Sequence, residues 1–409
     1  MSWTERLGPL RERNFAWFVA SRLTNTFGRT MATVALAFAV LDLTGSATAL
    51  GQVLAAHTVP MVLFLLFGGV VADRLPRTLV IQFSNVVSGL SQGVVATLLV
   101  TGTAELWMLI VLEAVHGLVS ALSFPALSSV VPQLVPREEL QQANALLSMS
   151  RGALTIVGPT AGALLVVTVG SGWALAVDAV AWLLAALLLL PVDLPGPAPR
   201  EESSTTWTEL REGWDLFRGT TWLWAVVLAF GVLNMIHQGA WYTLGPALAQ
   251  DTIGKQAWGY VLSAESVGLL LMTVVMLRVP MGRPLRLGMI GCAVMGLPIF
   301  LLGVEPRLAL LLVAAFIAGA GVEVFSMGWN LAMQENIGEE QLSRAYSYDA
   351  LGSFVAIPLG QLAYGPLGEL FGYAEVLTAS GVLYVAVSLV TLASRSVRDL
   401  PRRPIAPPT

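Results

Sequence analysis

The sequence has few charged residues, one cysteine and no recognisable catalytic or nucleotide-binding motif. Only 12% of its 409 residues are charged, whereas 56% are hydrophobic, so a soluble protein could not cover its surface. Cys292 stands alone, which excludes a disulfide or a cysteine-based metal cluster. The sequence contains no phosphate-cradling loop, no arrangement of nucleophile and base, and only three scattered histidines. We therefore expect no enzyme, no metal, no bound cofactor and no nucleic-acid partner.

The abundant feature is the long apolar run, which breaks only at charges, prolines and glycines. About 20 apolar residues cross a bilayer as a helix. By this criterion we count twelve spans, which run approximately over residues 15–41, 46–71, 78–101, 105–131, 140–168, 172–191, 220–250, 257–278, 285–303, 308–334, 341–368 and 372–394. The pattern predicts an all-α polytopic membrane protein with twelve transmembrane helices.

Arginine and lysine are distributed very unevenly between the two sets of connections. The two tails and every second loop hold 17 of them, whereas the opposite loops hold only Lys255 and Arg307. Basic residues favour the cytoplasmic side. We therefore expect both termini in the cytoplasm and a multi-pass protein of the cytoplasmic (inner) cell membrane.

The chain divides into two halves around its one long connection. We expect a six-helix lobe over 1–191, a cytoplasmic linker over 192–219, a second six-helix lobe over 220–394 and a cytoplasmic tail over 395–409. Within the linker, residues 206–218 fit an amphipathic helix on the membrane surface, or an ordinary linker with chance periodicity. An offset of 202 residues aligns Gly158 with Gly360 and the stretches before Ala143 and Ala345, as two parallel repeats predict.

The turn between spans two and three holds two glycines, an acid, two arginines and a proline within residues 68–77. We expect this turn to be very short and to lie outside the hydrocarbon. The pattern Gly69-x-x-x-Asp73-Arg74-x-x-Arg77 resembles the loop signature of the major facilitator superfamily. The resemblance implies a conformational latch, in which Asp73 forms a contact between the halves in one state only. Alternatively, the arginines only set the topology and Asp73 offsets their charge.

A second pattern, Gly158-Pro159-x-x-Gly162, resembles the span-five motif of proton-driven exporters in that superfamily. We expect a kinked, small-residue surface that forms a tight seam with a helix of the other half, or simple helix packing. The stretch from Phe124 to Leu146 is similar to the transmembrane secretion effector branch, which contains enterobactin exporters and macrolide efflux proteins. The resemblance covers the whole chain and implies the major facilitator fold.

Ionisable residues within the spans are candidates for function, because burying charge in a bilayer is costly. We single out Arg29, Glu113, His116, Arg151, Glu323 and Asp349. Arg29 and Glu113 share a depth in the bilayer, so we expect them to pair, with His116 one turn from Glu113. Glu113 would carry a coupling proton. Alternatively, the pair is a static salt bridge.

A mixed aromatic and polar face on span seven is the candidate wall of a substrate cavity. It presents Asn234, Gln238, Trp241 and Tyr242, which would suit a large, mostly apolar molecule. The resemblance adds Asn25, Glu323 and Asn330, since spans one, four, seven and ten line the cavity of that superfamily. The alternative for the two aromatic residues is an interfacial belt.

These features together predict a secondary active transporter. The function expected is proton-coupled efflux of an amphiphilic drug, macrolide or siderophore-like metabolite by alternating access, driven by the proton motive force. Its partners would be the small-molecule substrate, protons and the lipid bilayer, and the chain would act as a monomer. The alternatives are an importer or facilitator of a small nutrient, and a membrane scaffold or sensor that transports nothing.

Overall fold

The fold is taken from a computed structural model of the 409-residue chain. The structure describes residues 8–128, 130–136, 139–193, 214–276, 278–279 and 281–402. Side chains are described for these residues apart from 8, 65–74, 124, 125, 128, 339, 340, 343 and 344. The chain forms two compact units, the first made of residues 1–199 and 258–263, the second of 200–257 and 264–409.

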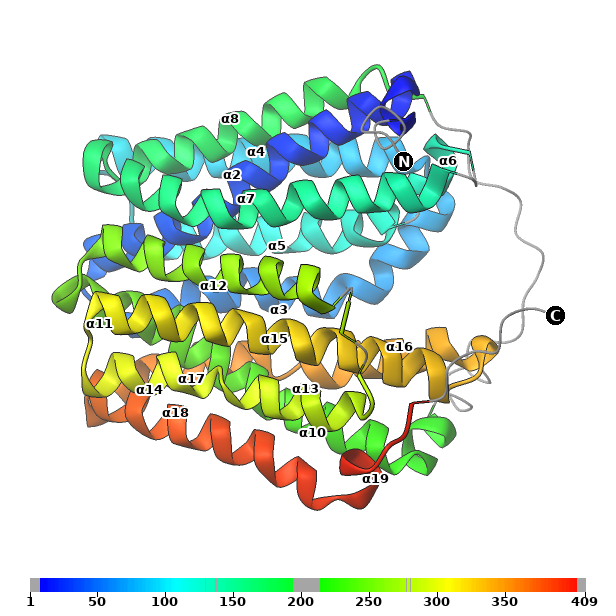
Figure 1. Ribbon diagram of the computed structural model, residues 1–409. Coiled ribbons are helices and arrows are strands. Elements are labelled where there is room, and N and C mark those ends of the chain that lie inside the picture. Colours follow the sequence, from blue (N-terminus) through cyan, green and yellow to red (C-terminus); the bar gives the residue numbers. More distant parts are fainter. Residues whose placement is uncertain are drawn as a thin grey trace. The chain divides into compact units, whose positions relative to one another are not determined.

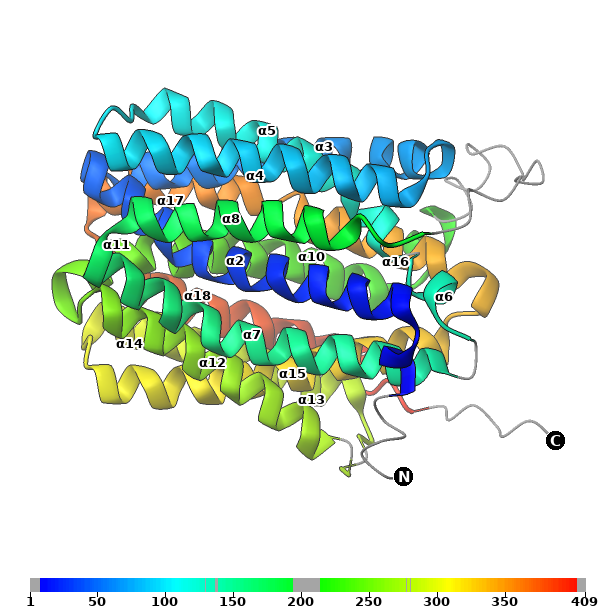
Figure 2. The same ribbon diagram turned by 90° about the horizontal axis from the view of Figure 1, so that it is seen from above.

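Helices alone build the described part of the first unit, which also contains residues 258–263 of α12 (Lys255–Met276). They are η1 (Gly8–Arg11), α2 (Arg13–Thr44), α3 (Ala47–Arg74), α4 (Arg77–Thr101), α5 (Leu106–Ser128), α6 (Val131–Leu134), α7 (Leu140–Val169) and α8 (Ser171–Leu189). Their main contacts join α3 to α5, α2 to α7, and α8 to both α2 and α4. Figure 2 shows α8 lying between α4 and α2. These neighbours decide which polar side chains can meet.

Helices also form the described part of the second unit (Figure 1). They are α10 (Thr221–Ile236), η3 (His237–Leu244), α11 (Gly245–Thr252), α12 (Lys255–Met276), α13 (Pro284–Ala293), α14 (Gly296–Val304), α15 (Leu308–Asn336), α16 (Glu339–Phe354), α17 (Ile357–Phe371), α18 (Tyr373–Val390), η4 (Thr391–Ala393) and α19 (Arg395–Arg398). The strongest pairs are α13 with α15 and α14 with α18. Residues 237–244 form a π-helix, a rare element that is frequent at functional sites.

The prediction of twelve spans is confirmed. Twelve helices or continuous helical stretches are long and apolar enough to cross a bilayer. The predicted turn over residues 68–77 is shorter than we expected. Gly68 to Arg74 continue α3, and α4 begins at Arg77, so only Leu75 and Pro76 lie outside a helix. Proline disfavours helical geometry in the residue before it, which explains why α3 ends there.

The two units end corresponding helices in the same way. Gly170 between α7 and α8 has φ +96°, and Gly372 between α17 and α18 has φ +95°. These positive angles are costly for residues with a side chain. The two glycines are separated by the same 202 residues that align Gly158 with Gly360. The two halves of the chain therefore resemble each other in backbone conformation at these positions as well as in sequence.

Most of the predicted amphipathic linker helix lies outside the described residues. Residues 214–219 are helical, and the rings of Trp214 and Phe217 stack in a group with Tyr348 of α16. The ring centroids of Phe217 and Tyr348 are 5.7 Å apart. This end of the predicted stripe thus packs on protein, in contrast to the expected membrane surface.

Candidate functional site

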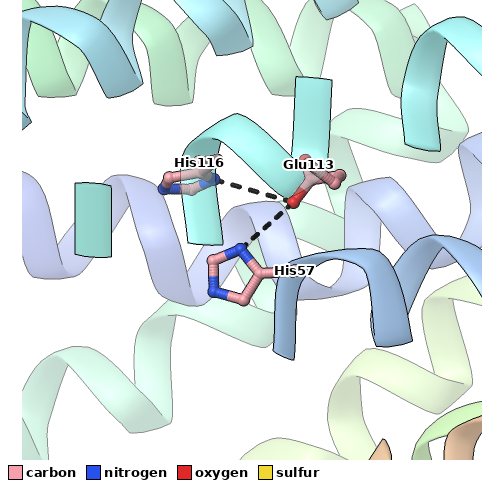
Figure 3. A group of neighbouring side chains, drawn as sticks. All are labelled: His57, Glu113 and His116. Atoms are coloured by element: carbon pink, nitrogen blue, oxygen red, sulfur yellow. Dashed lines mark ion pairs between the residues drawn. The ribbon is translucent and has the colours of Figure 1, made fainter. Parts of the chain in front are cut away.

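Glu113 is the centre of a buried polar cluster in the first unit. It lies on α5 and is only 3% exposed, and its carboxylate contacts two imidazole rings. Its Oε2 atom is 3.4 Å from Nδ1 of His57 on α3 and 3.6 Å from Nδ1 of His116, one turn further along α5. Figure 3 shows both ion pairs converging on this one carboxylate oxygen.

Gln92 on α4 completes the cluster from a third helix. Its side-chain nitrogen donates to Glu113 Oε1 at 2.7 Å and lies 3.0 Å from His116 Nδ1. When Gln92 donates to His116 Nδ1, the His116 ring is neutral with its proton on Nε2, and the contact of Nδ1 with Glu113 Oε2 is an ion pair only when His116 is protonated. Trp182 of α8 closes the other side, with its ring centroid 5.3 Å from that of His116. Both Glu113 oxygens therefore have partners from within the first unit.

Two local features of the sequence bring these helices together. Gly117 has no side chain at the point where the backbone carbonyl of His57 packs on α5, and a Cβ there would overlap that carbonyl. Small residues allow such close approach in membrane proteins. The hydroxyls of Ser84 and Ser91 donate to the carbonyls of Val119 and Leu112, at 2.8 Å and 2.9 Å, and so hold α4 on α5. Gln92 is the next residue after Ser91, so the same contact holds it against α5.

The expected pair between Arg29 and Glu113 does not form. Among the ion pairs of the described residues, Glu113 pairs with His57 and His116, and Arg29 has none. The reason is the helix neighbours: α2 packs on α7 and α8, whereas α5 packs on α3 and α4. The contact between α2 and α5 is slight, so equal depth in the bilayer brings Arg29 within electrostatic range of His116 but not into an ion pair with Glu113. Arg29 instead lies within electrostatic range of Arg151 and of the buried Asp178.

The cluster also corrects the expectation that the histidines are scattered. His57, Glu113 and His116 offer ligand atoms within 4.8 Å of one another, a donor set that zinc accepts. Yet the Gln92 amide nitrogen lies against both Glu113 Oε1 and His116 Nδ1. Its N–H groups would repel a cation there. The arrangement fits a hydrogen-bonded acid–base cluster better than a metal site.

The export-type motif packs inside its own unit. A Cβ on Gly158 would overlap the Thr30 side chain of α2, and one on Gly162 would lie 2.6 Å from the carbonyl oxygen of Met31. Both glycines therefore serve the seam between α7 and α2. Pro159 lies within α7 between them.

The same stretch of α7 also contacts residues 258–263 of α12, a helix of the predicted second half that belongs to this compact unit over those residues. The hydroxyls of Thr160 and Ser263 lie 2.7 Å apart, and Gly259 packs against the carbonyl of Pro159. The motif therefore packs on α2 and also forms the expected contact with a helix of the other half.

The second unit holds a comparable buried carboxylate, Glu265, which is another ionisable residue within a predicted span. Trp241, which is fully buried on η3, donates from Nε1 to Glu265 Oε2 of α12 at 3.0 Å. Gly319 of α15 packs against the carbonyl of Glu265, as Gly117 does against that of His57. The ring of Tyr242 lies 5.3 Å from that of His237. Burial of Trp241 argues against the interfacial belt.

The remaining predicted cavity residues separate into two groups. Glu323 and Asn330 line a cavity of about 800 Å³ in the second unit. In contrast, Asn234 donates to the carbonyl of Ser353 at 3.0 Å, and Asp349 accepts hydrogen bonds from Trp329 and Ser353. Gln238 is half-buried on η3. In the first unit, Asn25 is buried, and its amide nitrogen has no partner among the described residues.

Gly69, Asp73 and Arg74 lie in the stretch of α3 for which the structure describes the backbone alone. The backbone puts all three in the last turns of α3, and Arg77 at the start of α4. Arg151 lies on α7, where it lines a pocket together with Arg22 of α2. The latch therefore stays a prediction. Arg22 and Arg151, in contrast, are placed together at one pocket.

The comparisons with known proteins agree with this fold. The family model described as Major Facilitator Superfamily matches residues 18–360. Macrolide efflux protein A of Streptococcus pyogenes is 23% identical over 90% of this chain and 92% of that protein. The enterobactin exporter EntS of Shigella boydii serotype 18 is 26% identical over 82% of each chain.

A solved structure of similar fold is the nucleoside transporter NupG. It has a TM-score of 0.76 and 12% sequence identity, and it covers 93% of this chain and 98% of its own. At that identity the likeness concerns the fold alone.

Proposed function

Because the chain belongs to the Major Facilitator Superfamily, we propose that it is a proton-coupled exporter of an amphiphilic small molecule. It is a multi-pass membrane transporter, and its relatives include bacterial efflux proteins. We assign the coupling proton to the cluster of Glu113, His57 and His116. The transport cycle would be alternating access of the two lobes.

The observation that carries this proposal is the burial of Glu113 beside two imidazoles in a membrane span. An isolated charge at this depth is costly, so it needs a partner or a proton. The cluster can hold carboxylate with imidazolium, or carboxylic acid with neutral imidazole. Gaining or losing one proton changes its net charge by one unit. A conformational change that exposes it to alternate sides of the membrane would therefore move protons.

The proton motive force provides enough energy for this work. One charge that crosses a potential of 100 mV contributes about 2.3 kcal/mol. That energy sustains a substrate gradient on the order of fifty-fold for each proton. No further cofactor is needed in this proposal.

The cavity of the second unit supports an amphiphilic substrate. Its wall combines the flexible apolar side chains of Met276, Met281 and Met327 with the polar groups of Glu323 and Asn330. Methionine adapts its shape to varied apolar ligands. At about 800 Å³ the cavity is of drug-binding size. We include Asn25, Asn234, Gln238, Trp241 and Tyr242 as residues that shape or support the substrate path.

Orientation and the latch complete the proposal. We assign both termini to the cytoplasm from the distribution of basic residues. The turn between α3 and α4 would then be cytoplasmic, with Asp73 as a contact made in one state of the cycle. The working unit would be a monomer in the inner membrane.

The function is tested with inverted membrane vesicles that contain the protein. Erythromycin and enterobactin are the probes, chosen because similar proteins bear the names of a macrolide and of enterobactin. An acidic interior should drive accumulation of at least one probe, and dissipating the pH gradient should abolish it. Accumulation only in right-side-out vesicles would indicate an importer. Neither transport nor ligand-induced stabilisation would favour a scaffold or sensor.

A further inference from the structure

A small pocket in the first unit is lined by two arginines from neighbouring helices. It has a volume of about 280 Å³ and lies between α2, α5, α6 and α7. Arg22 and Thr26 reach it from α2, and Asn144, Ser148 and Arg151 reach it from α7. None of its lining residues carries a carboxylate. The pocket is therefore positively charged.

The polar residues at the pocket are regularly spaced along both helices. Arg22, Thr26 and Arg29 follow one another at four and three residues along α2, so they share one face. Asn144, Ser148 and Arg151 repeat that spacing along α7. The two helices pack on each other. Two matching polar faces thus meet in a chain that is otherwise poor in charge.

The arginines lack a negative partner. Within the described ranges, Arg22, Arg29 and Arg151 form no ion pair and no side-chain hydrogen bond. Arg22 lies within electrostatic range of Arg29 and Arg151, which repel it, and the buried Asp178 is near Arg29. Arg29 and Arg151 are exposed and Arg22 is half-buried, so their charges are open to a ligand, and like charges grouped in membrane spans without a partner are costly. Their presence together indicates that an anion from outside the chain neutralises them during function.

We propose that this pocket binds the anionic group of the transported amphiphile. A guanidinium group offers paired N–H donors that match a carboxylate or phosphate. The hydroxyls of Thr26 and Ser148 add further donors. Phe18, Leu23 and Leu127 supply an apolar wall beside the charge. The pocket is too small for a whole macrolide, but it suits a carboxylate on a compact ring.

This inference rests on the proposed function and narrows its substrate class to anionic amphiphiles. A cationic amphiphile would be repelled by Arg22 and Arg151. A lipid phosphate has the same chemistry as a substrate anion, and arginines near a bilayer surface often reach for it. The test must therefore separate a soluble anion from a lipid headgroup.

The test is equilibrium binding of radiolabelled 2-naphthoate and of 2-naphthamide, its neutral amide, to the full-length protein in nanodiscs. It is made at fixed pH without any gradient. We expect naphthoate to bind wild type at least tenfold more tightly than the amide. Arg22→Gln and Arg151→Gln should each weaken naphthoate binding about tenfold and leave amide binding unchanged. Arg151→Lys should retain part of the affinity, and Arg307→Gln, on an exposed loop, should retain all of it.

Two results would overturn the proposal. One is equal affinity of wild type for the acid and the amide. The other is naphthoate binding in phosphatidylcholine nanodiscs that vanishes when phosphatidylglycerol is added, which would make the pocket a lipid site. Since no proton gradient is present, failure of proton coupling or of export would leave this binding result intact.

Discussion

Nδ1 of His57 on α3 lies 3.4 Å from Oε2 of Glu113 on α5, and the backbones of the two helices touch one turn away. There, the carbonyl of His57 packs against Gly117. The ion pair and the glycine contact therefore depend on the same close approach. Changing either should disturb the other.

Replacing Gly117 by alanine should destabilise the first unit. The new Cβ would overlap the carbonyl of His57, and such overpacking costs about 1–3 kcal/mol. Thermal unfolding in detergent should show a lowered midpoint for Gly117→Ala. The matched control is Gly93→Ala on α4, where a Cβ meets only Ala179 at 3.8 Å. Equal midpoints for the two variants would contradict the packing described for α3 and α5.

Replacing His57 by glutamine should weaken the dependence of transport on pH. The variant removes one of the two imidazoles that share protons with Glu113, so the transport rate should vary less steeply between pH 5 and 8. Initial rates in proteoliposomes at a series of pH values measure this. His237→Gln, a membrane histidine in the second unit, should keep the wild-type profile. An unchanged profile for His57→Gln would exclude His57 from proton coupling.

Replacing Trp241 by phenylalanine should destabilise the second unit. It removes the donor to the buried Glu265 carboxylate, and an unsatisfied buried acceptor costs about 1–3 kcal/mol. A double-mutant cycle with Glu265→Gln, followed by thermal unfolding, isolates this contact from the loss of ring volume. Trp224→Phe, at a more exposed position on α10, is the control. Strictly additive effects would show that the hydrogen bond contributes nothing.

Acid should release the C-terminal helix α19. Asp399 is 3.1 Å from Arg283, and Arg398, together with Arg283 and Arg286, holds the pKa of Asp399 below its ordinary value. The contact is therefore present above the ordinary pKa of aspartate, about 3.9, and is lost as the pH falls through the lower folded value. Hydrogen exchange of residues 395–399 should accelerate only in that acidic range.

At neutral pH, Asp399→Asn should reproduce this acceleration in part, because the exposed ion pair is weak and screened by salt. Asp251→Asn removes the same charge from an exposed position at the end of α11 and should leave the exchange of α19 unchanged. Wild-type exchange in Asp399→Asn would mean that the ion pair does not hold α19.

The sequence predicted well what depends on local spacing. The twelve apolar runs became twelve spans, because length and hydropathy suffice for that conclusion. Glu113 and His116 share a helix face as their spacing requires. The glycines at 158 and 162 form a packing surface, as small residues at that spacing should.

Sequence reasoning failed where the result depends on which helices are neighbours. Equal depth predicts a pair of Arg29 and Glu113, but α2 packs mainly on α7 and α8, whereas α5 packs mainly on α3 and α4. His57 has little signal in the sequence, because it lies in a mostly apolar run and has no charged residue near it in the chain. Gln92 had a weak signal, since Ser84, Ser88 and Ser91 precede it on one polar face of α4. That polar face does not show that the partner of Gln92 is Glu113 on α5.

The most direct test of the account compares wild type with Glu113→Gln in proteoliposomes, with the probe that accumulates best in inverted vesicles. Gradient-driven accumulation and exchange of labelled for unlabelled probe at equal pH are measured together. The account predicts that Glu113→Gln loses accumulation but keeps exchange, while Glu105→Gln, at an exposed position just before α5, keeps both. Full proton-driven accumulation by Glu113→Gln would contradict the assignment of the coupling proton to this cluster.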